Sequence, residues 1–316
     1  MNLQTKIPLQ TQQFNQVDYN SKVLLLGSCF SENIGEKFEY FKFQQLQNPI
    51  GILFHPLAIE RAITNAVNEK EYTKDDIFFH NEQWHCFDAH SRLSHPSEDQ
   101  LLHVLNDSIT RTHQFLKEAS HVIVTLGTAW AYRCIETDNL VANCHKLPQK
   151  KFLKELLSVS QISESLDAIM SLIKTINPKM SFMFTVSPVR HIKDGFIENT
   201  QSKSHLISAI HEIVEPRYHS YYFPSYEIMM DELRDYRFYT DDMLHPNATA
   251  INYIWERFLE VWISENTQST MKTVDDIQKG LAHRPFNSES DAHQTFLQQL
   301  KTKEIFMQSK FPHMTF

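Results

Sequence analysis

Three predominantly apolar runs divide the chain, and each is followed by a small residue. They cover residues 22–26, 121–126 and 180–186, and Gly27 and Gly127 follow the first two. An apolar run of this length, closed by a turn signal, is typical of a strand that is buried on both faces. We therefore predict that these runs form the central strands of one sheet.

Amphipathic segments separate these runs. Apolar residues at helical spacing predict helices, and two shorter runs predict further strands. The predicted helices are 31–40, 56–68, 97–119, 160–176, 206–214 and 247–264, with a helix or turn at 226–233 and short strands at 41–46 and 221–224. Strands that alternate with helices form a parallel sheet covered on both faces. We expect an α/β protein, a flavodoxin-like three-layer α/β/α sandwich with a mainly parallel sheet.

Two segments depart from this alternation. Residues 76–93 contain two short apolar stretches around a polar turn, which predicts a β-hairpin. We place this hairpin and its flanking helices, about 56–118, in an insertion, and expect the hairpin to serve as a lid, as a partner surface or as packing over the sheet edge. Residues 129–150 show no regular pattern and are predicted to form a loop.

The length of 316 residues is sufficient for one large core with additions. Residues 1–266 are predicted to form the core domain. Residues 267–316 are polar, with one predicted helix over 290–308, and are expected to form a C-terminal helical extension. No pattern indicates the oligomeric state.

Charge and hydropathy narrow the classes of partner. The formal net charge of −8 argues against a nucleic-acid-binding protein, because such proteins present a basic surface to phosphates. Residues 1–16 contain Gln, Asn and Thr where a signal peptide has an apolar stretch, and no later run approaches the length of a membrane span. We therefore expect a cytoplasmic protein without membrane insertion.

Cysteine and histidine spacing argues against a bound metal. No two of the four cysteines form a C-x-x-C pair, so neither a disulfide framework nor a structural zinc site is expected. Four histidines recur every five residues. This spacing places successive side chains on opposite faces of a strand and does not keep them on one face of a helix, so it does not gather them into one metal site. They are His80, His85, His90 and His95. We expect no metal and no organic cofactor.

Candidate chemistry lies at two distant turns. Ser28 follows the first predicted strand, and a D-x-x-H-P sequence, which begins at Asp242, precedes the last core helix. In a turn, the Asp242 carboxylate can accept a hydrogen bond from Nδ1 of His245. Nε2 of the same ring is then left to take a proton from a serine. Each residue also has a structural alternative. Ser28 is a good helix N-cap, Cys29 is a second possible nucleophile, Asp241 is a rival carboxylate, and Asp242 and His245 are ordinary turn residues.

Seven ordered sequence blocks carry a more specific signal. They are Gly27-Ser28-Cys29-Phe30-Ser31, Asn48-Pro49-Ile50-Gly51, Leu126-Gly127-Thr128-Ala129-Trp130, Asn143-Cys144-His145-Lys146, Ser187-Pro188-Val189-Arg190, Asn199-x-x-Ser202-Lys203-Ser204 and Asp242-x-x-His245-Pro246-Asn247. Over residues 22–258 the chain resembles the GSCFA-domain family, within the SGNH or GDSL-like hydrolases. Ser31 stands where the family name has alanine.

This resemblance implies an SGNH-type serine esterase, acyl hydrolase or O-acyltransferase that forms an acyl-serine intermediate. It implies that Ser28 is the nucleophile, His245 the general base and Asp242 the residue that orients it. The implied partner is a small-molecule or carbohydrate ester, such as an O-acetylated sugar. A non-catalytic sugar- or anion-binding protein on the same fold is the alternative.

The resemblance also implies an oxyanion hole made by the backbone N–H groups of Ser28 and Gly51. The wider superfamily has an asparagine two residues after the glycine of the third block, whereas this chain has Ala129. We expect Asn143, and after it Asn48, to replace that donor. A turn contact is an equally good explanation of Asn143.

Other block residues are expected to line the substrate site. Gly127 ends the second central strand, and Trp130 can stack on a sugar or shelter the site. His145 belongs to a polar block. Arg190 and His191 can bind an anionic or hydroxyl-rich group, with solvated loop charges as the slightly favoured alternative.

Overall fold

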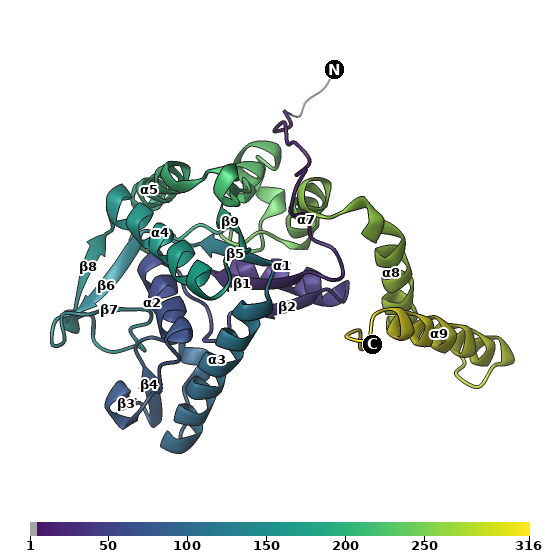
Figure 1. The fold of residues 1–316 in the computed structure, drawn as a ribbon, viewed down its shortest axis with the longest axis horizontal. Coiled ribbons are helices and arrows are strands. Elements are labelled where there is room, and N and C mark those ends of the chain that lie inside the picture. Colours follow the sequence, from purple (N-terminus) through teal and green to yellow (C-terminus); the bar gives the residue numbers. More distant parts are fainter. Residues whose placement is uncertain (1–4) are drawn as a thin grey trace.

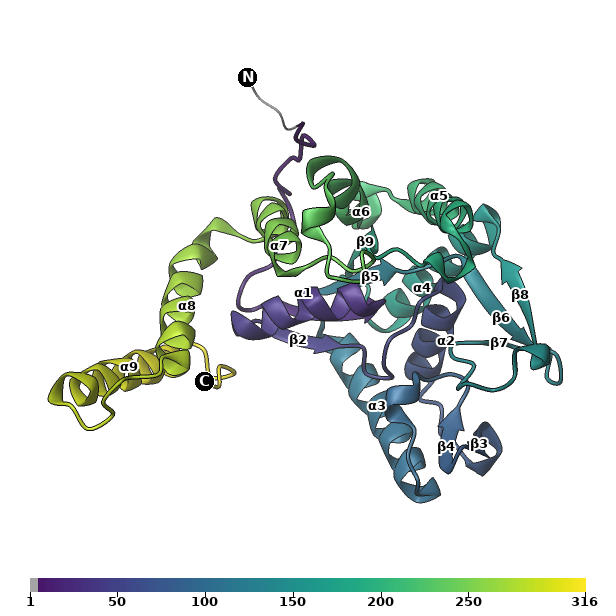
Figure 2. The same cartoon turned by 180° about the vertical axis from the view of Figure 1, so that it is seen from behind.

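The predicted central strands form a five-stranded parallel sheet in the computed structural model, which describes residues 5–316 (Figures 1 and 2). The strand order is β10-β9-β5-β1-β2, and every neighbouring pair is parallel. The strands are β1 (Lys22–Gly27), β2 (Gln44–Gln47), β5 (His121–Leu126), β9 (Ser181–Val186) and β10 (Ser220–Tyr222). Their carboxyl ends therefore meet at one edge of the sheet.

Helices cover both faces of this sheet (Figures 1 and 2). The helices of the main fold are α1 (Cys29–Tyr40), α2 (Pro56–Val67), α3 (Glu98–Glu118), α4 (Val159–Ile176), α5 (Phe196–Ile213), α6 (Ser225–Glu227) and α7 (Ala248–Trp262). Helices α8 (Gln268–Ala282) and α9 (Asp291–Lys310) extend away from the sheet (Figures 1 and 2). In β1, Leu24 and Leu26 join the core under α2–α5, whereas Val23 and Leu25 join the core under α1 and α7. This alternation confirms the three-layer α/β/α sandwich.

The prediction of a loop over residues 129–150 is wrong in part. Residues Trp130–Cys134 form β6, which pairs antiparallel with β7 (Leu140–Val141) and β8 (Phe152–Leu156). These short strands are only partly buried, so they contain no continuous apolar run that would reveal them. The resulting small sheet lies beside α5, at one end of the molecule (Figure 1).

Residues 56–118 contribute to the main fold as well as to the hairpin. Helices α2 and α3 pack on the sheet and on α4, whereas β3 (Ile77–His80) and β4 (Gln83–Cys86) form a separate two-stranded sheet. An amphipathic helix has the same apolar stripe whether it belongs to an insertion or packs on the main sheet. The sequence pattern alone therefore does not show which of these positions α2 and α3 occupy.

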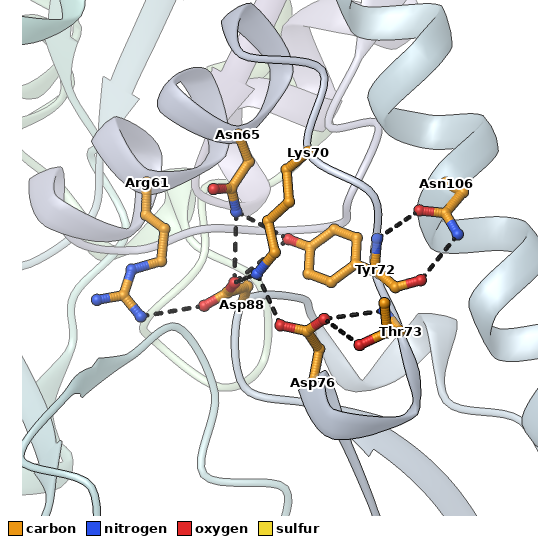
Figure 3. A network of polar contacts seen from close by, with 8 residues as sticks. All are labelled: Arg61, Asn65, Lys70, Tyr72, Thr73, Asp76, Asp88 and Asn106. Carbon is orange, nitrogen blue, oxygen red and sulfur yellow. Dashed lines mark hydrogen bonds and ion pairs between the residues drawn. The ribbon is translucent and has the colours of Figure 1, made fainter.

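A polar network attaches the hairpin region to α2 (Figure 3). The Asp88 carboxylate, which follows β4, accepts from Arg61 at 3.2 Å and from Asn65 at 3.4 Å. The hydroxyl of Tyr72 donates to the same carboxylate at 3.3 Å, and the Lys70 ammonium lies 3.8 Å from it. These contacts fix the end of the hairpin relative to the sheet.

The C-terminal extension contains α8 in addition to the single helix that the sequence predicts. Side chains of both helices, including Val274 and Met307, join the core under α1 and α7. The extension lies at the end of the molecule opposite the small sheet (Figures 1 and 2). In the described part of the chain, no helix has the length and apolar character needed to span a membrane.

Candidate functional site

Ser28 lies where β1 ends and α1 begins. Gly27 makes this turn possible, because its φ is +128° and a Cβ there would lie 2.0 Å from the carbonyl oxygen of Thr125. Ser28 is the N-cap residue of α1, yet its side chain makes no capping hydrogen bond. Its Oγ is fully buried and has no hydrogen-bond partner within residues 5–316. The capping alternative is therefore not realised.

Gly127 provides space for this serine. It follows β5, and its backbone N–H donates to the Phe54 carbonyl at 2.9 Å. A Cβ at position 127 would lie 3.2 Å from Cβ of Ser28, closer than most side chains approach. The carboxyl ends of β1 and β5 thus pack directly against each other around Ser28.

Asp242 and His245 form a hydrogen-bonded pair. Oδ2 of Asp242 lies 2.6 Å from Nδ1 of His245, and Oδ1 accepts from the backbone amides of Leu244 at 2.8 Å and His245 at 3.0 Å. The bond from the His245 amide is the largest of several that hold the pKa of the Asp242 carboxyl well below its usual range. The predicted contact through Nδ1 is confirmed. The carboxylate orients the ring, and Nε2 makes no hydrogen bond with the described residues.

The loop that carries this pair is a tight turn on the end of β9. The amide of Thr240 donates to the His245 carbonyl at 2.8 Å, and Met243 adopts φ +59°, which is uncommon for a non-glycine residue. Arg190 holds the turn: its amide donates to the carbonyl of Leu244 at 3.2 Å, and its guanidinium stacks 4.2 Å from the Tyr239 ring. In this structure, Arg190 contacts the turn that positions His245.

The Ser28 hydroxyl and the His245 ring are not hydrogen-bonded to each other in this structure. Ser28 is fully buried, whereas the side chain of His245 is 47% exposed. His191 lies close to His245 and against the ring of Phe54, 5.5 Å away between ring centres. Burial, with smaller effects of the charges on Lys203 and His245, lowers the pKa of His191 to about 3, so this ring is neutral.

The N–H groups expected to form the oxyanion hole are engaged within the protein. The Ser28 amide donates to the Thr125 carbonyl at 3.0 Å, and the Gly51 amide donates to the Asn48 carbonyl at 2.7 Å. Ala129 is fully buried in the core under α2–α5, so its side chain faces the core.

The two candidate asparagines differ in what their amides do. Asn143 accepts from the His145 amide at 2.8 Å, which is the turn contact given as its alternative. Oδ1 of Asn48 accepts from the Gly27 amide at 2.9 Å, while its Nδ2 is buried without a partner among the described residues. Because the amide group lies beside Gly27, Asn48 presents an unused donor next to the Ser28 turn.

A cavity of about 460 Å³ lies between the loops that follow β5 and β9 and the small sheet. Its lining includes Phe54, Thr128, Trp130, Tyr132, Asn143 and His191. The cavity reaches the residue after Gly127, but Ser28 and His245 are not part of its lining. The small sheet that the sequence did not predict thus supplies one wall of the cavity.

Two further predicted site residues in this lining have structural contacts. The His145 ring is buried, and its Nε2 lies 2.7 Å from the Cys86 carbonyl, which ties the loop to the hairpin. Burial lowers the pKa of His145 to about 4. Trp130 donates from Nε1 to the Glu198 carbonyl at 3.3 Å, and the Lys154 ammonium lies 4.3 Å from its ring centre.

Lys203 is the main functional candidate to which the sequence reasoning gave no role, although it lies in the sixth sequence block. It is 1% exposed, and its Nζ donates to the carbonyls of Gly127 and Ser187, each at 2.7 Å. A further signal was its place on the buried stripe of α5, where Leu206 and Ile210 are apolar.

Within residues 5–316, no group of three or more His, Cys, Asp or Glu side chains is placed to hold a metal ion.

Comparisons with known families match both parts of the chain. Residues 22–258 match the model described as the GSCFA family. Residues 274–316 match the model described as the C-terminal domain of GSCFA domain proteins. No curated protein matches the chain.

Proposed function

Because this chain belongs to the GSCFA family, we propose that it is an SGNH-type serine esterase that acts through Ser28, His245 and Asp242. The observation that carries this proposal is the 2.6 Å contact between Asp242 and Nδ1 of His245. It leaves Nε2 of His245 as a base, and the Ser28 hydroxyl has no hydrogen-bond partner among the described residues to compete for its proton. The placement within the SGNH superfamily is part of the proposal.

The reaction is acyl transfer. Oγ of Ser28 attacks the ester carbonyl as Nε2 of His245 takes its proton, and the tetrahedral adduct collapses to an acyl-serine as that proton passes to the leaving alkoxide. Water, or an acceptor hydroxyl, then attacks the acyl-serine with His245 again as the base. The first outcome is ester hydrolysis and the second is O-acyl transfer.

Catalysis requires Ser28 and His245 to approach each other. The pair lacks a hydrogen bond in this structure, and catalytic contacts often form fully only in the complex with substrate. His245 lies on an exposed turn, whereas Ser28 lies on the sheet. The proposal therefore places the required movement in the turn of residues 240–245.

Asn48 is the oxyanion donor of this proposal. Its Nδ2 is buried, has no hydrogen-bond partner in the described part of the chain, and is held beside Gly27 by the bond that its Oδ1 accepts. The amino end of α1, which begins directly after Ser28, adds a favourable dipole for a negative charge. This donor takes the place of the asparagine that is absent at Ala129.

The cavity favours a compact, partly apolar substrate such as an O-acetylated sugar. Aromatic walls from Phe54, Trp130 and Tyr132 suit a sugar ring, and the Asn143 amide supplies a polar partner. A volume of about 460 Å³ is within the ordinary range for small ligands. The acyl group would extend past Thr128 toward Ser28.

One observation favours a second function, non-catalytic binding of a sugar or an anion. Ser28 is fully buried and does not line the cavity. On this alternative, the aromatic cavity binds a ligand and Ser28 only packs in the turn. The alternative predicts binding without labelling of Ser28.

The deciding experiment is active-site labelling. We expect the wild-type protein to hydrolyse p-nitrophenyl acetate and to react with a fluorophosphonate probe at Ser28, and the Ser28→Ala variant to lose both. Removal of a catalytic serine typically lowers kcat by about 10⁶-fold. Cys29→Ala is the matched control, because it alters the adjacent side chain and should preserve labelling. Unchanged labelling and turnover in Ser28→Ala would overturn the mechanism.

A further inference from the structure

A buried lysine joins the carboxyl ends of two central strands beside Ser28. Nζ of Lys203, on α5, donates to the carbonyl of Gly127, after β5, and to that of Ser187, after β9. Both contacts are 2.7 Å long, and the side chain is 1% exposed. The ammonium therefore has no access to solvent and is fixed by the sheet itself.

The neighbours of this ammonium include no carboxylate among the residues that the structure describes. The Cys29 thiol approaches from α1, the His191 ring from the loop after β9, and the Tyr226 ring from α6, with its centre 5.8 Å from Nζ. Burial lowers the pKa of Lys203 to about 7. A buried cation without a counter-ion is unfavourable for folding and is characteristic of functional sites.

Position 127 shows why a cation is useful here. Gly127 packs directly on Ser28, and its carbonyl oxygen carries a negative partial charge. Such a charge disfavours the oxyanion of an acyl adduct. The Lys203 ammonium binds this carbonyl and that of Ser187, and so places a positive charge against both oxygens.

On the premise of the esterase function above, we propose that Lys203 is a positioning residue of the Ser28 site, whose ammonium fixes the ends of β5 and β9 and stabilises the anionic adduct. As Oγ bonds to the ester carbon, the carbonyl π pair moves to oxygen. The serine proton passes to His245, and Lys203 keeps its own protons throughout.

This role predicts the alkaline side of the pH profile. Activity needs neutral His245 and protonated Lys203, so kcat/KM falls as the pH rises through about 7, the pKa of Lys203. The facing groups do not account for this fall. Burial raises the pKa values of the Cys29 thiol and the Tyr226 hydroxyl, and His191 is already neutral.

The test compares two substitutions at one position. Lys203→Met keeps much of the aliphatic stem but removes the charge. We expect kcat for p-nitrophenyl acetate to fall about 10²-fold, with KM within about threefold of the wild-type value. The decrease of kcat/KM at alkaline pH should disappear. Lys203→Arg should restore part of kcat and keep it at high pH, because a guanidinium does not lose its proton. Ser202→Ala, on the same turn of α5, is the matched control and should keep the alkaline fall.

The outcomes separate this role from the esterase function. If Ser28 is labelled but Lys203→Met keeps the wild-type kcat and pH profile, the role of Lys203 is overturned alone. If wild-type protein shows neither turnover nor labelling, both proposals fail.

A measurement on wild-type protein decides the case in which neither variant folds. We follow the lysine Cε resonances by NMR and identify the one that shifts when the probe labels Ser28. Titration of this resonance near pH 7 supports the proposal. Titration near the ordinary lysine value of about 10.4, or no resonance that responds to labelling, contradicts it.

Discussion

At the scale of single residues, Asn48 offers the sharpest test of the oxyanion site. Its backbone has φ +38°, a conformation that asparagine and aspartate tolerate better than most residues. We expect Asn48→Asp to keep the acceptor for the Gly27 amide while it removes the donor. Loss of one such donor lowers kcat by about 10²- to 10³-fold. Steady-state kinetics should show this loss with little change in KM.

Asn143→Asp is the matched control for this change. Its Oδ1 also accepts a backbone amide, that of His145, and the substitution preserves that acceptor in the same way. We therefore expect a much smaller effect on kcat. A wild-type kcat in Asn48→Asp, or equal losses in both variants, would show that Asn48 is not the donor.

The predictability of these residues depends on how local their contacts are. The contact of Asp242 with His245 lies within one turn, so the spacing of three residues was sufficient to predict it. The free amide of Asn48 and the contacts of Lys203 depend on several strand ends that meet only after folding. Both residues lie in the sequence blocks, but no local pattern indicates which atoms their side chains contact.

At the scale of elements, the start of α2 is sensitive to acid. His55 is its N-cap residue: Nδ1 accepts from the Ala58 amide at 3.2 Å, and Nε2 lies 3.1 Å from the Val141 carbonyl. Both contacts require the neutral ring with its proton on Nε2. Burial lowers the pKa of His55 to about 4, whereas an unfolded histidine has a value of about 6.5.

The pH dependence follows from these two values. The unfolded chain binds the extra proton first, so this contribution to stability is complete above about pH 6.5 and decreases as the pH falls toward about 4. The free energy of unfolding of the wild-type protein should decrease between about pH 7.5 and 5. His55→Asn keeps a capping side chain but cannot titrate, so we expect its free energy of unfolding to decrease by about 2 kcal/mol less over the same range. Urea unfolding at the two values measures it. An identical loss in wild type and variant would contradict this account.

Helices and strands were predictable from the sequence where their burial produced a clear pattern of apolar residues. The three central strands are apolar on both faces, and the amphipathic helices show their stripes, so the α/β/α class followed from the sequence. The sheet β7-β6-β8 is partly exposed on each strand, so its pattern resembles a loop. The start of α5 was missed because its buried face carries Asn199, Ser202 and Lys203 where apolar residues are usual.

At the scale of the whole molecule, the C-terminal extension supports the sheet from the side opposite the site. The ring of Phe311 lies 5.0 Å from that of Tyr19, and His313 lies 3.2 Å from the Lys42 carbonyl. Tyr19 and Lys42 precede β1 and β2, so these contacts stand at the amino ends of the strands. The extension can therefore affect stability without contact with Ser28.

We expect this arrangement to make folding of core and extension cooperative. Met307 is 2% exposed in the core that α9 shares with α1 and α7, and truncation of such a side chain to alanine costs about 2–5 kcal/mol. Met307→Ala should lower the free energy of unfolding by this amount in one transition. Ile305, 57% exposed on the same helix, provides the control, since Ile305→Ala should change it by less than about 0.5 kcal/mol.

The form of the unfolding curve decides between a shared core and an independent extension. If α8 and α9 only trailed from the domain, Met307→Ala would produce two transitions, and the transition of the sheet would not move. The shared apolar cluster predicts instead that circular dichroism and tryptophan fluorescence shift together, because Trp255 and Trp262 lie in that cluster. Folded Met307→Ala protein should still label at Ser28 at the wild-type rate, since its defect lies at the amino ends of the strands.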